Sequence, residues 1–169
     1  MQSEEPQLSS YNFRFTGGDS NTYVFETGSG SSYEITFKPS GYLFDEQDAF
    51  RDDVYEFSIN LISHKSARLP LTDPLIAPTA VGVFQDFHDK HGLVVIYICD
   101  SSDNRQLVRY RKFGIWFHRY RHLGFIKMDV EIDDPRGTIY TSLLMHRQYR
   151  YRDEAVLAFL RITDRENSK

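Results

Sequence analysis

Apolar and aromatic residues alternate with polar residues in four short segments of the first third of the chain. The alternating positions are Tyr11, Phe13 and Phe15; Tyr23 and Phe25; Tyr33, Ile35 and Phe37; and Tyr55, Phe57, Ile59 and Leu61. Because successive side chains of a strand point to opposite faces, each set predicts a strand with one apolar face. Turn sequences separate the sets, so we expect an antiparallel meander of four strands. A short fifth strand is expected near Tyr42 to Phe44.

Helical spacing and longer apolar runs dominate the rest of the chain. The pattern predicts a helix beginning near Pro78, a buried strand over 93–99, a helix over 103–121, strands over 124–132 and 137–145, and a helix over 153–163. Strands grouped first and helices gathered later predict an α+β domain, with the helix-strand-helix-strand-strand-helix part packed on the sheet. We expect a disordered lead-in over 1–10, a single domain over 11–163 and a frayed tail over 164–169.

Composition narrows the classes of function. The chain has 169 residues, of which 40% are hydrophobic and 26% charged, which excludes collagen-like and wholly disordered proteins. Cys99 is the single cysteine, so neither an intrachain disulfide nor a multi-cysteine zinc site can form. No apolar run approaches the roughly 20 residues of a membrane helix, and the acidic start does not resemble a signal peptide. We therefore expect a cytoplasmic protein that has no cofactor and does not bind membranes.

The net charge of −4 conceals an uneven distribution along the chain. Residues 1–90 hold 6 Lys and Arg against 14 Asp and Glu, a balance of −8, whereas residues 91–169 hold 14 against 10, a balance of +4. On a helical wheel of the helix over 103–121, one arc of about 80° contains four cations and the single tryptophan. These residues are Arg105, Arg109, Lys112, Trp116 and Arg119. The opposite side is the expected core face: Leu107, Tyr110, Gly114 and Phe117, with Gly114 allowing close approach of another element.

Two interpretations of this cationic stripe stay open. In the first, the stripe binds an anionic partner, Trp116 offers a stacking platform, and Arg147 and Arg150 extend the basic surface. In the second, the stripe is a solvated helix face whose charges are neutralised by the acidic N-terminal half of the chain. A sequence pI of about 5.8 favours the second interpretation, because nucleic-acid-binding domains are usually basic.

Asp100 and Asp103 are the candidates for catalysis because they follow the buried strand, a position where site residues often gather. Two carboxylates there could hold a divalent cation, or Asp100 could act as a general base. Capping explains the same residues without catalysis, with Asp103 at the helix start and Asp100 paired with a nearby arginine. The sequence therefore contains no recognisable catalytic set or metal site, and it favours a protein that is not an enzyme.

Residues 94–103, followed by Arg105, Arg109 and Trp116, resemble a family of small uncharacterised bacterial proteins, a domain of unknown function. The stretch from Tyr33 to Tyr42 is similar to the same family, so the resemblance covers roughly residues 11–160. It implies a bacterial origin and a soluble intracellular protein. It implies no activity, cofactor or catalytic residue.

The leading hypothesis is a non-catalytic protein-interaction module of the immunity, antitoxin or defence-associated type. It rests on the uneven charge, the aromatic-rich sheet and the missing catalytic set. The acidic sheet half could meet a basic partner, and complementary charge would steer the encounter. The alternative is a nucleic-acid-binding protein or small nuclease-like enzyme that uses the helix over 103–121. That alternative predicts binding that weakens steeply with salt.

Overall fold

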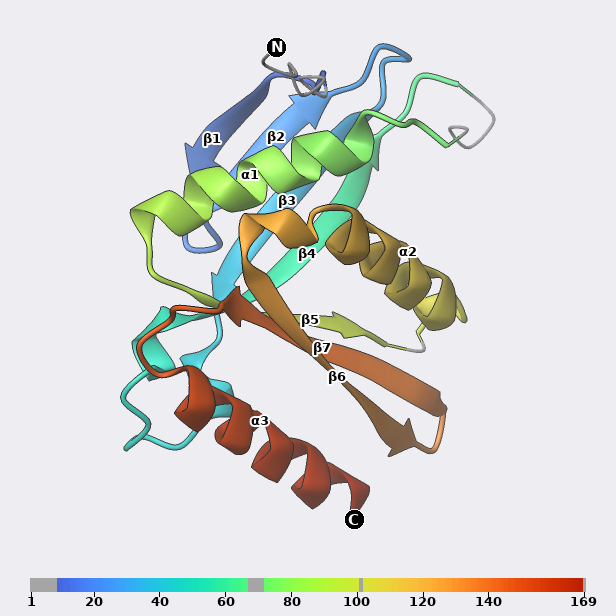
Figure 1. Cartoon of the computed structure of the whole chain (residues 1–169). Coiled ribbons are helices and arrows are strands. Elements are labelled where there is room, and N and C mark those ends of the chain that lie inside the picture. The colour runs from blue at the N-terminus through green and yellow to red at the C-terminus, as the bar shows by residue number, and fades with distance from the viewer. Residues whose placement is uncertain (1–8, 67–71, 101, 169) are drawn as a thin grey trace, which may run out of the picture. The chain divides into compact units, whose positions relative to one another are not determined.

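A computed structural model describes residues 9–66, 72–100 and 102–168, so most of the expected lead-in lies outside the described residues. The described residues form a mixed sheet in the order β1-β2-β3-β4-β5-β7-β6 (Figure 1). Its strands are β1 Phe13–Gly17, β2 Thr22–Glu26, β3 Ser32–Pro39, β4 Val54–Ser63, β5 Val94–Cys99, β6 Phe125–Asp134 and β7 Gly137–His146. The α-helices are α1 Ile76–Lys90, α2 Gln106–Arg119 and α3 Arg152–Asn167, and short 3₁₀ helices are η1 Gly41–Leu43, η2 Arg51–Asp53 and η3 Arg121–Leu123.

The chain divides into two compact units, each built from two segments. The first contains Met1–Thr36 and Ile59–Lys90, and the second contains Phe37–Ser58 and His91–Lys169. In the first unit β1, β2 and β3 are antiparallel neighbours. The ring of Tyr23, only 1% exposed, lies edge-on to Phe87 of α1 with 6.4 Å between ring centres, and its hydroxyl donates to Asp86 at 2.7 Å. The apolar face of the meander therefore packs against α1.

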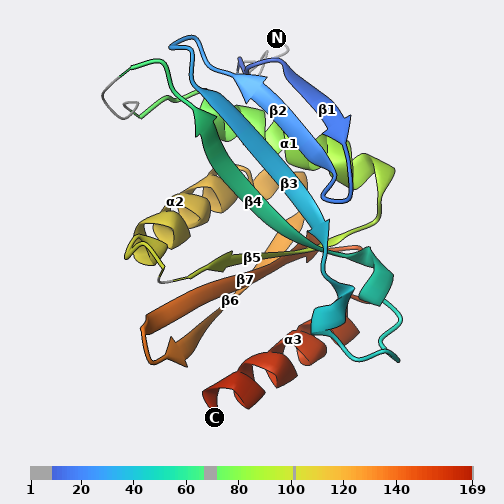
Figure 2. The same cartoon turned by 180° about the vertical axis from the view of Figure 1, so that it is seen from behind.

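The second unit is a sheet covered by a helix on each face (Figures 1 and 2). β4 and β5 are parallel over Val54–Glu56 and Val94–Ile96, whereas β5 and β6 both pair with β7 in antiparallel fashion. Under α3, the core consists of Phe44, Phe50, Val54, Val94, Ile96, Leu143, Met145, Ala155, Ala158 and Phe159. On the other face, Phe113 of α2 packs on Tyr97 of β5, with 4.9 Å between ring centres. Successive side chains of β5, β6 and β7 thus point to opposite faces of the sheet, one set towards α2 and the other towards α3.

The expected fold class is confirmed, because the four N-terminal strands are followed by the predicted order of helices and strands. The fifth strand expected near Tyr42 to Phe44 is wrong: Gly41–Leu43 form a 3₁₀ turn, in which the Phe44 N–H donates to the Gly41 carbonyl. Backbone groups used within a turn are not available to a strand ladder. α1 begins two residues before Pro78. Proline has no backbone N–H, but the N–H groups of the first helical turn have no acceptor within the helix, so Pro78 costs α1 no hydrogen bond.

Two further boundaries differ from the expected ones. α2 begins at Gln106 and ends at Arg119, so it is shorter at both ends than the helix expected over 103–121. α3 continues through Asn167, beyond the end expected at residue 163, and the Asn167 side chain holds this last turn against β6. Within the described ranges, no helix is long and apolar enough to cross a membrane.

Candidate functional site

Asp100 and Asp103, the two catalytic candidates, form hydrogen bonds that stabilise the turn between β5 and α2. Asp100 accepts bonds from the backbone N–H and the hydroxyl of Ser102, at 3.0 and 2.6 Å. Asp103 accepts from the Arg109 guanidinium at 2.6 Å and from the Arg105 N–H at 3.0 Å. Hydrogen bonds from Ser102 lower the pKa of Asp100, and those from Arg109 and Arg105 lower the pKa of Asp103. Carboxylates stabilised in their charged form are weak general bases. Arg105 is the N-cap of α2 and no side chain caps the helix, so Asp103 holds the turn before the helix rather than capping it, while Asp100 lies 3.7 Å from the Arg109 guanidinium.

A polar row that the sequence does not reveal lies beneath α2. Register places Tyr97, Ser142 and Asp129 side by side on β5, β7 and β6. The Asp129 carboxylate accepts a hydrogen bond from the Ser142 hydroxyl and forms an ion pair with the Lys127 ammonium, both at 2.5 Å. The Lys127 side chain is only 7% exposed, and its ammonium lies 5.1 Å from the ring centre of Tyr110 on α2. Polar residues at alternate positions of a strand are typical of a solvent face, yet α2 covers Lys127.

Cys99 lies on the same face of the sheet as this row and is only 1% exposed. Burial raises the pKa of its thiol, so the residue is a small buried hydrophobe rather than a nucleophile. Among the described residues, no three His, Cys, Asp or Glu side chains gather closely enough to hold a metal ion.

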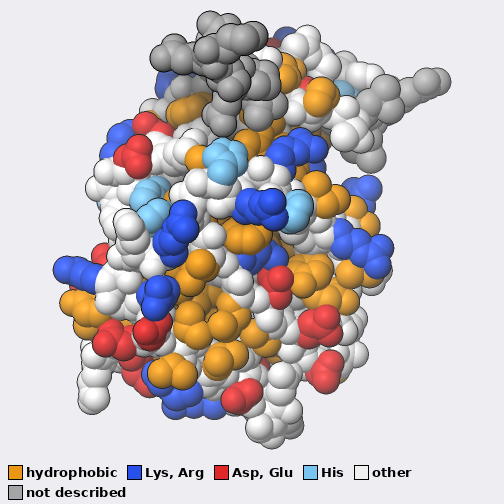
Figure 3. Space-filling view, in the orientation of Figure 1, with side chains coloured by type: hydrophobic (Ala, Val, Ile, Leu, Met, Phe, Trp, Pro, Cys, Tyr) orange, Lys and Arg blue, Asp and Glu red, His pale blue; other side chains and the backbone are white. Residues whose placement is uncertain are grey.

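The side of α2 that faces solvent differs from the side expected from the cationic stripe. Val108 and Ile115, two turns apart, are 65% and 60% exposed, so they mark the centre of the outward direction. Four exposed cations flank this pair: Arg105, Arg111, Lys112 and Arg119. We call these six residues the outer face of α2. Figure 3 shows Lys and Arg side chains with apolar side chains among them over this helix.

Arg109 and Trp116 lie at the margin of this outer face rather than on it. Arg109 is held by the turn through Asp103 and the Asp100 carbonyl. The Trp116 ring is partly buried and meets Phe113 edge-on with 5.4 Å between ring centres. The Lys112 ammonium lies 5.1 Å from the centre of the Trp116 ring, and partial burial lowers the pKa of Lys112, although the residue as a whole is exposed. Trp116 is therefore partly buried and in contact with Phe113 and Lys112, which limits the ring surface that it offers for stacking a base.

The expected core face of α2 is only partly correct. Tyr110 stacks on Tyr140 of β7 with 4.8 Å between ring centres, and Phe113 packs on Tyr97. Leu107, by contrast, is 37% exposed, and a Cβ added at Gly114 would meet nothing within 4 Å. Gly114 therefore does not serve a close approach of another element.

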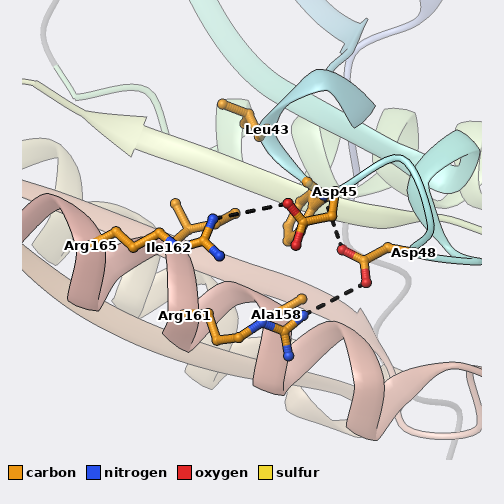
Figure 4. A pocket seen from close by; sticks show the side chains of 8 residues that line it. Leu43, Asp45, Asp48, Ala158, Arg161, Ile162 and Arg165 are labelled. Carbon is orange, nitrogen blue, oxygen red and sulfur yellow. Dashed lines mark hydrogen bonds and ion pairs between the residues drawn. The ribbon is translucent and has the colours of Figure 1, made fainter.

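The acidic loop between η1 and η2 pairs with α3. Asp48 lies 3.7 Å from the Arg161 guanidinium, and Asp45 lies 3.9 Å from that of Arg165 (Figure 4). The space between them is about 10 Å³, which is too small for an organic ligand. Within the described ranges, no carboxylate lies within 4.0 Å of the four cations on the outer face of α2. The acidic loop therefore neutralises α3 and leaves the charge of α2 to solvent or to a partner.

Arg147 and Arg150 lie in the segment that joins β7 to α3. The Arg147 N–H donates to the Gly124 carbonyl at 2.9 Å, which places Arg147 beside the turn that follows α2. Arg150 lies 3.9 Å from Asp53 and stacks on Tyr151 at 4.6 Å. An open hollow of about 350 Å³ is lined by residues 147–154. Its arginines share it with Asp153 and Glu154, and Arg152 pairs with Asp153 at 2.8 Å, so the hollow is not uniformly basic.

A family model described as "Family of unknown function (DUF6169)" matches residues 72–161, which are 90 of the 169 residues. The chain belongs to the DUF6169 family. This membership confirms the resemblance to a family of unknown function that the sequence of β5 and α2 indicates. The DUF6169 match begins just before α1 and ends within α3, so it includes α2 and β6.

Two further comparisons were made for this DUF6169 member, one with curated proteins and one with solved structures. No curated protein matches the chain. A solved structure, the CoA-dependent acyl-homoserine lactone synthase MesI, is similar with a TM-score of 0.37 and 10% identity over 92% of this chain and 78% of the synthase. At that TM-score and identity, the similarity supports no statement about activity.

Proposed function

We propose that this DUF6169 protein is a protein-interaction module that docks an acidic partner on the outer face of α2. One observation carries the proposal: Val108 and Ile115 are 65% and 60% exposed at the centre of a helix face flanked by cations. Exposing large aliphatic side chains to water is unfavourable, so burying them against a partner favours binding. The assignment to immunity, antitoxin or defence-associated proteins stays a prediction from the sequence.

The charge around the aliphatic pair defines the chemistry of the partner. α2 contains no Asp or Glu, and the described carboxylates nearest in sequence already serve the turn before the helix. A partner with carboxylates around an apolar centre would pair with Arg105, Lys112 and Arg119 while covering the aliphatic side chains. Such complementarity favours an acidic surface once the two proteins are in contact and disfavours a basic one.

The same geometry favours a protein over a nucleic acid. Phosphate backbones match cations but offer nothing apolar to Val108 and Ile115, and single-strand binding depends on exposed rings for stacking. Trp116 is engaged by Phe113 and Lys112, as described above.

The test places a photo-crosslinking residue at Ile115 in the living cell of origin, with Ile62 as the matched control. Ile62 is a 54% exposed aliphatic residue on β4. We expect an acidic protein to crosslink at position 115 and not at position 62. The captured protein is then purified, and its affinity is measured for the wild type and for single aspartate variants.

Ile115→Asp should weaken binding of the purified partner by about 30-fold, as expected for the loss of a hot-spot residue, whereas Ile62→Asp should leave it unchanged. Equal affinity of the Ile115→Asp variant and the wild type would overturn the proposal. Preferential binding of single-stranded oligothymidylate, reduced by Lys112→Ala, would support the nucleic-acid alternative instead.

A further inference from the structure

Among the residues that the structure describes, β6 is the last strand of its sheet, and no described strand covers the backbone groups at its outer edge. In the strand order, β6 neighbours β7 only. The Asn167 side chain accepts from the Asp133 N–H at 3.1 Å and donates to the Glu131 carbonyl at 3.3 Å. These two backbone groups therefore point away from β7. Because hydrogen-bonding direction alternates along an antiparallel strand, the backbone groups of Lys127 and Asp129 point outward too.

The contact of Asn167 with this edge resembles the contact that a neighbouring strand would make. Its side-chain amide offers one N–H and one carbonyl, the same pair that a peptide unit of a neighbouring strand would offer. The contact uses only the last two residues of the edge, Glu131 and Asp133. The rest of the edge, from Lys127 to the Glu131 N–H, has no such substitute among the described residues.

The two sides of this edge differ in chemistry. On the side of α2, the carboxylates of Asp129, Glu131 and Asp133 follow one another at alternate positions. On the side of α3, Leu160 lies on the same helix side as Asn167, since the two residues are seven apart, and it is 38% exposed. Leu157, one turn of helix away, is 58% exposed. Figure 3 shows a broad apolar area over α3 and beside β6.

We infer that the outer edge of β6 binds an extended segment of another protein by strand addition, and that this segment alternates basic with aliphatic residues. In an added strand, every second side chain would lie beside the three carboxylates, and the others would lie beside Leu157 and Leu160. A second copy of β6 does not fit, because its own carboxylates would face those of the first copy. This edge is distinct from the outer face of α2, and the inference does not depend on the proposed function.

The probe is a capped, fluorescent nine-residue peptide in which Lys alternates with Val, and the protein is the full chain. We expect saturable binding that slows amide hydrogen exchange at Lys127, Asp129 and Glu131. Two control peptides separate strand addition from simple charge attraction. The first has the same composition with Lys and Val in separate blocks, and the second carries N-methyl groups on the residues whose N–H faces β6. Each should bind at least about tenfold more weakly, because pattern and main-chain bonds are both required.

Protein variants locate the site. Glu131→Lys should weaken binding about tenfold, whereas Glu46→Lys, the same charge change in an exposed loop, should weaken it only slightly. Asn167→Ala removes the internal competitor and should strengthen binding several-fold. Ile115→Asp should bind the peptide as the wild type does, so a failure here is distinguishable from a failure of the proposed function.

The inference is overturned if the N-methylated peptide binds as well as the unmodified one, or if Glu131→Lys and Glu46→Lys weaken binding equally. It is also overturned if the chain alone dimerises through β6, seen as slowed exchange at Lys127 and Asp129 that depends on protein concentration.

Discussion

The ion pair between Lys127 and Asp129 should respond very differently to removal of one partner or the other. The Lys127 side chain is 7% exposed, whereas that of Asp129 is 37% exposed. Asp129→Ala therefore leaves an ammonium group enclosed between β6 and α2 without its counter-charge. Lys127→Met leaves a carboxylate that water reaches and that still accepts the Ser142 hydroxyl. The exposed partner should thus be the costlier one to remove.

The magnitude follows from the surroundings of each group. Stranding one charge of a buried pair costs about 3–5 kcal/mol of folding free energy. The rings of Tyr97 and Tyr110, with centres 5.8 and 5.1 Å from the ammonium, recover about 1 kcal/mol of this by cation–π attraction. We therefore expect Asp129→Ala to destabilise the protein by about 2–4 kcal/mol. Lys127→Met should cost about 0–1 kcal/mol, because a carboxylate in contact with water is rehydrated and a thioether chain fills the space of the lysine stem.

The assay is urea unfolding at neutral pH, followed by the fluorescence of Trp116, the single tryptophan, which lies on α2 in the same unit. The variants are the two single substitutions and the double substitution Lys127→Met/Asp129→Ala. The double variant should be more stable than Asp129→Ala alone, because no enclosed charge remains. If Lys127→Met is as destabilising as Asp129→Ala, or the double variant is the least stable, the reasoning is refuted.

Two other predictions concern glycines and acid stability. Gly41→Ala should destabilise the protein by about 2–3 kcal/mol in the same unfolding assay, because its Cβ would lie 2.4 Å from the Arg51 carbonyl oxygen; Gly114→Ala, with nothing within 4 Å, should stabilise it by about 1 kcal/mol. Equal effects of the two substitutions would contradict this. Hydrogen bonds from Lys90 and Tyr23 lower the pKa of Asp86, so its stabilising contribution is present at neutral pH and is lost as the pH falls below about 4. Asp86→Asn should therefore flatten the acid limb of a stability–pH curve, and an unchanged limb would count against the role of these hydrogen bonds.

The order of strands and helices could be predicted because period-two alternation and turn residues are local signals. Tyr23, Phe25, Ile35 and Phe37 alternate in sequence, and all four are at most 4% exposed. The 3₁₀ turn at Gly41 carries aromatic and aliphatic neighbours that read equally well as a short strand. Its geometry depends on Arg51, ten residues away, whose side chain donates to the Gly41 carbonyl at 3.1 Å.

The candidate site was harder to predict, because a helical wheel gives relative angles but not which side meets the protein. The cationic residues define a stripe, yet Arg109 at its edge is drawn into the turn by Asp103, and Trp116 is drawn towards Phe113. The outward direction is set instead by Phe113 and Tyr110, which pack on β5 and β7. That packing turns Val108 and Ile115 to solvent, a result that the sequence pattern alone does not contain.

The positions and ion pairs of the acidic residues explain why the net charge of −4 carries little information about binding. Asp45 and Asp48 pair with α3, so the cations of α2 stay available, while Glu131 and Asp133 leave the edge of β6 acidic. Surfaces of opposite sign in one unit largely cancel beyond the screening length of about 8 Å in physiological salt. Long-range attraction therefore gives neither surface much selectivity, and each must select its partner through contacts made at short range. The exposed aliphatic residues, Val108 and Ile115 on α2 and Leu157 and Leu160 beside β6, supply those contacts, so their replacement should change partner affinity more than the loss of any single charge around them.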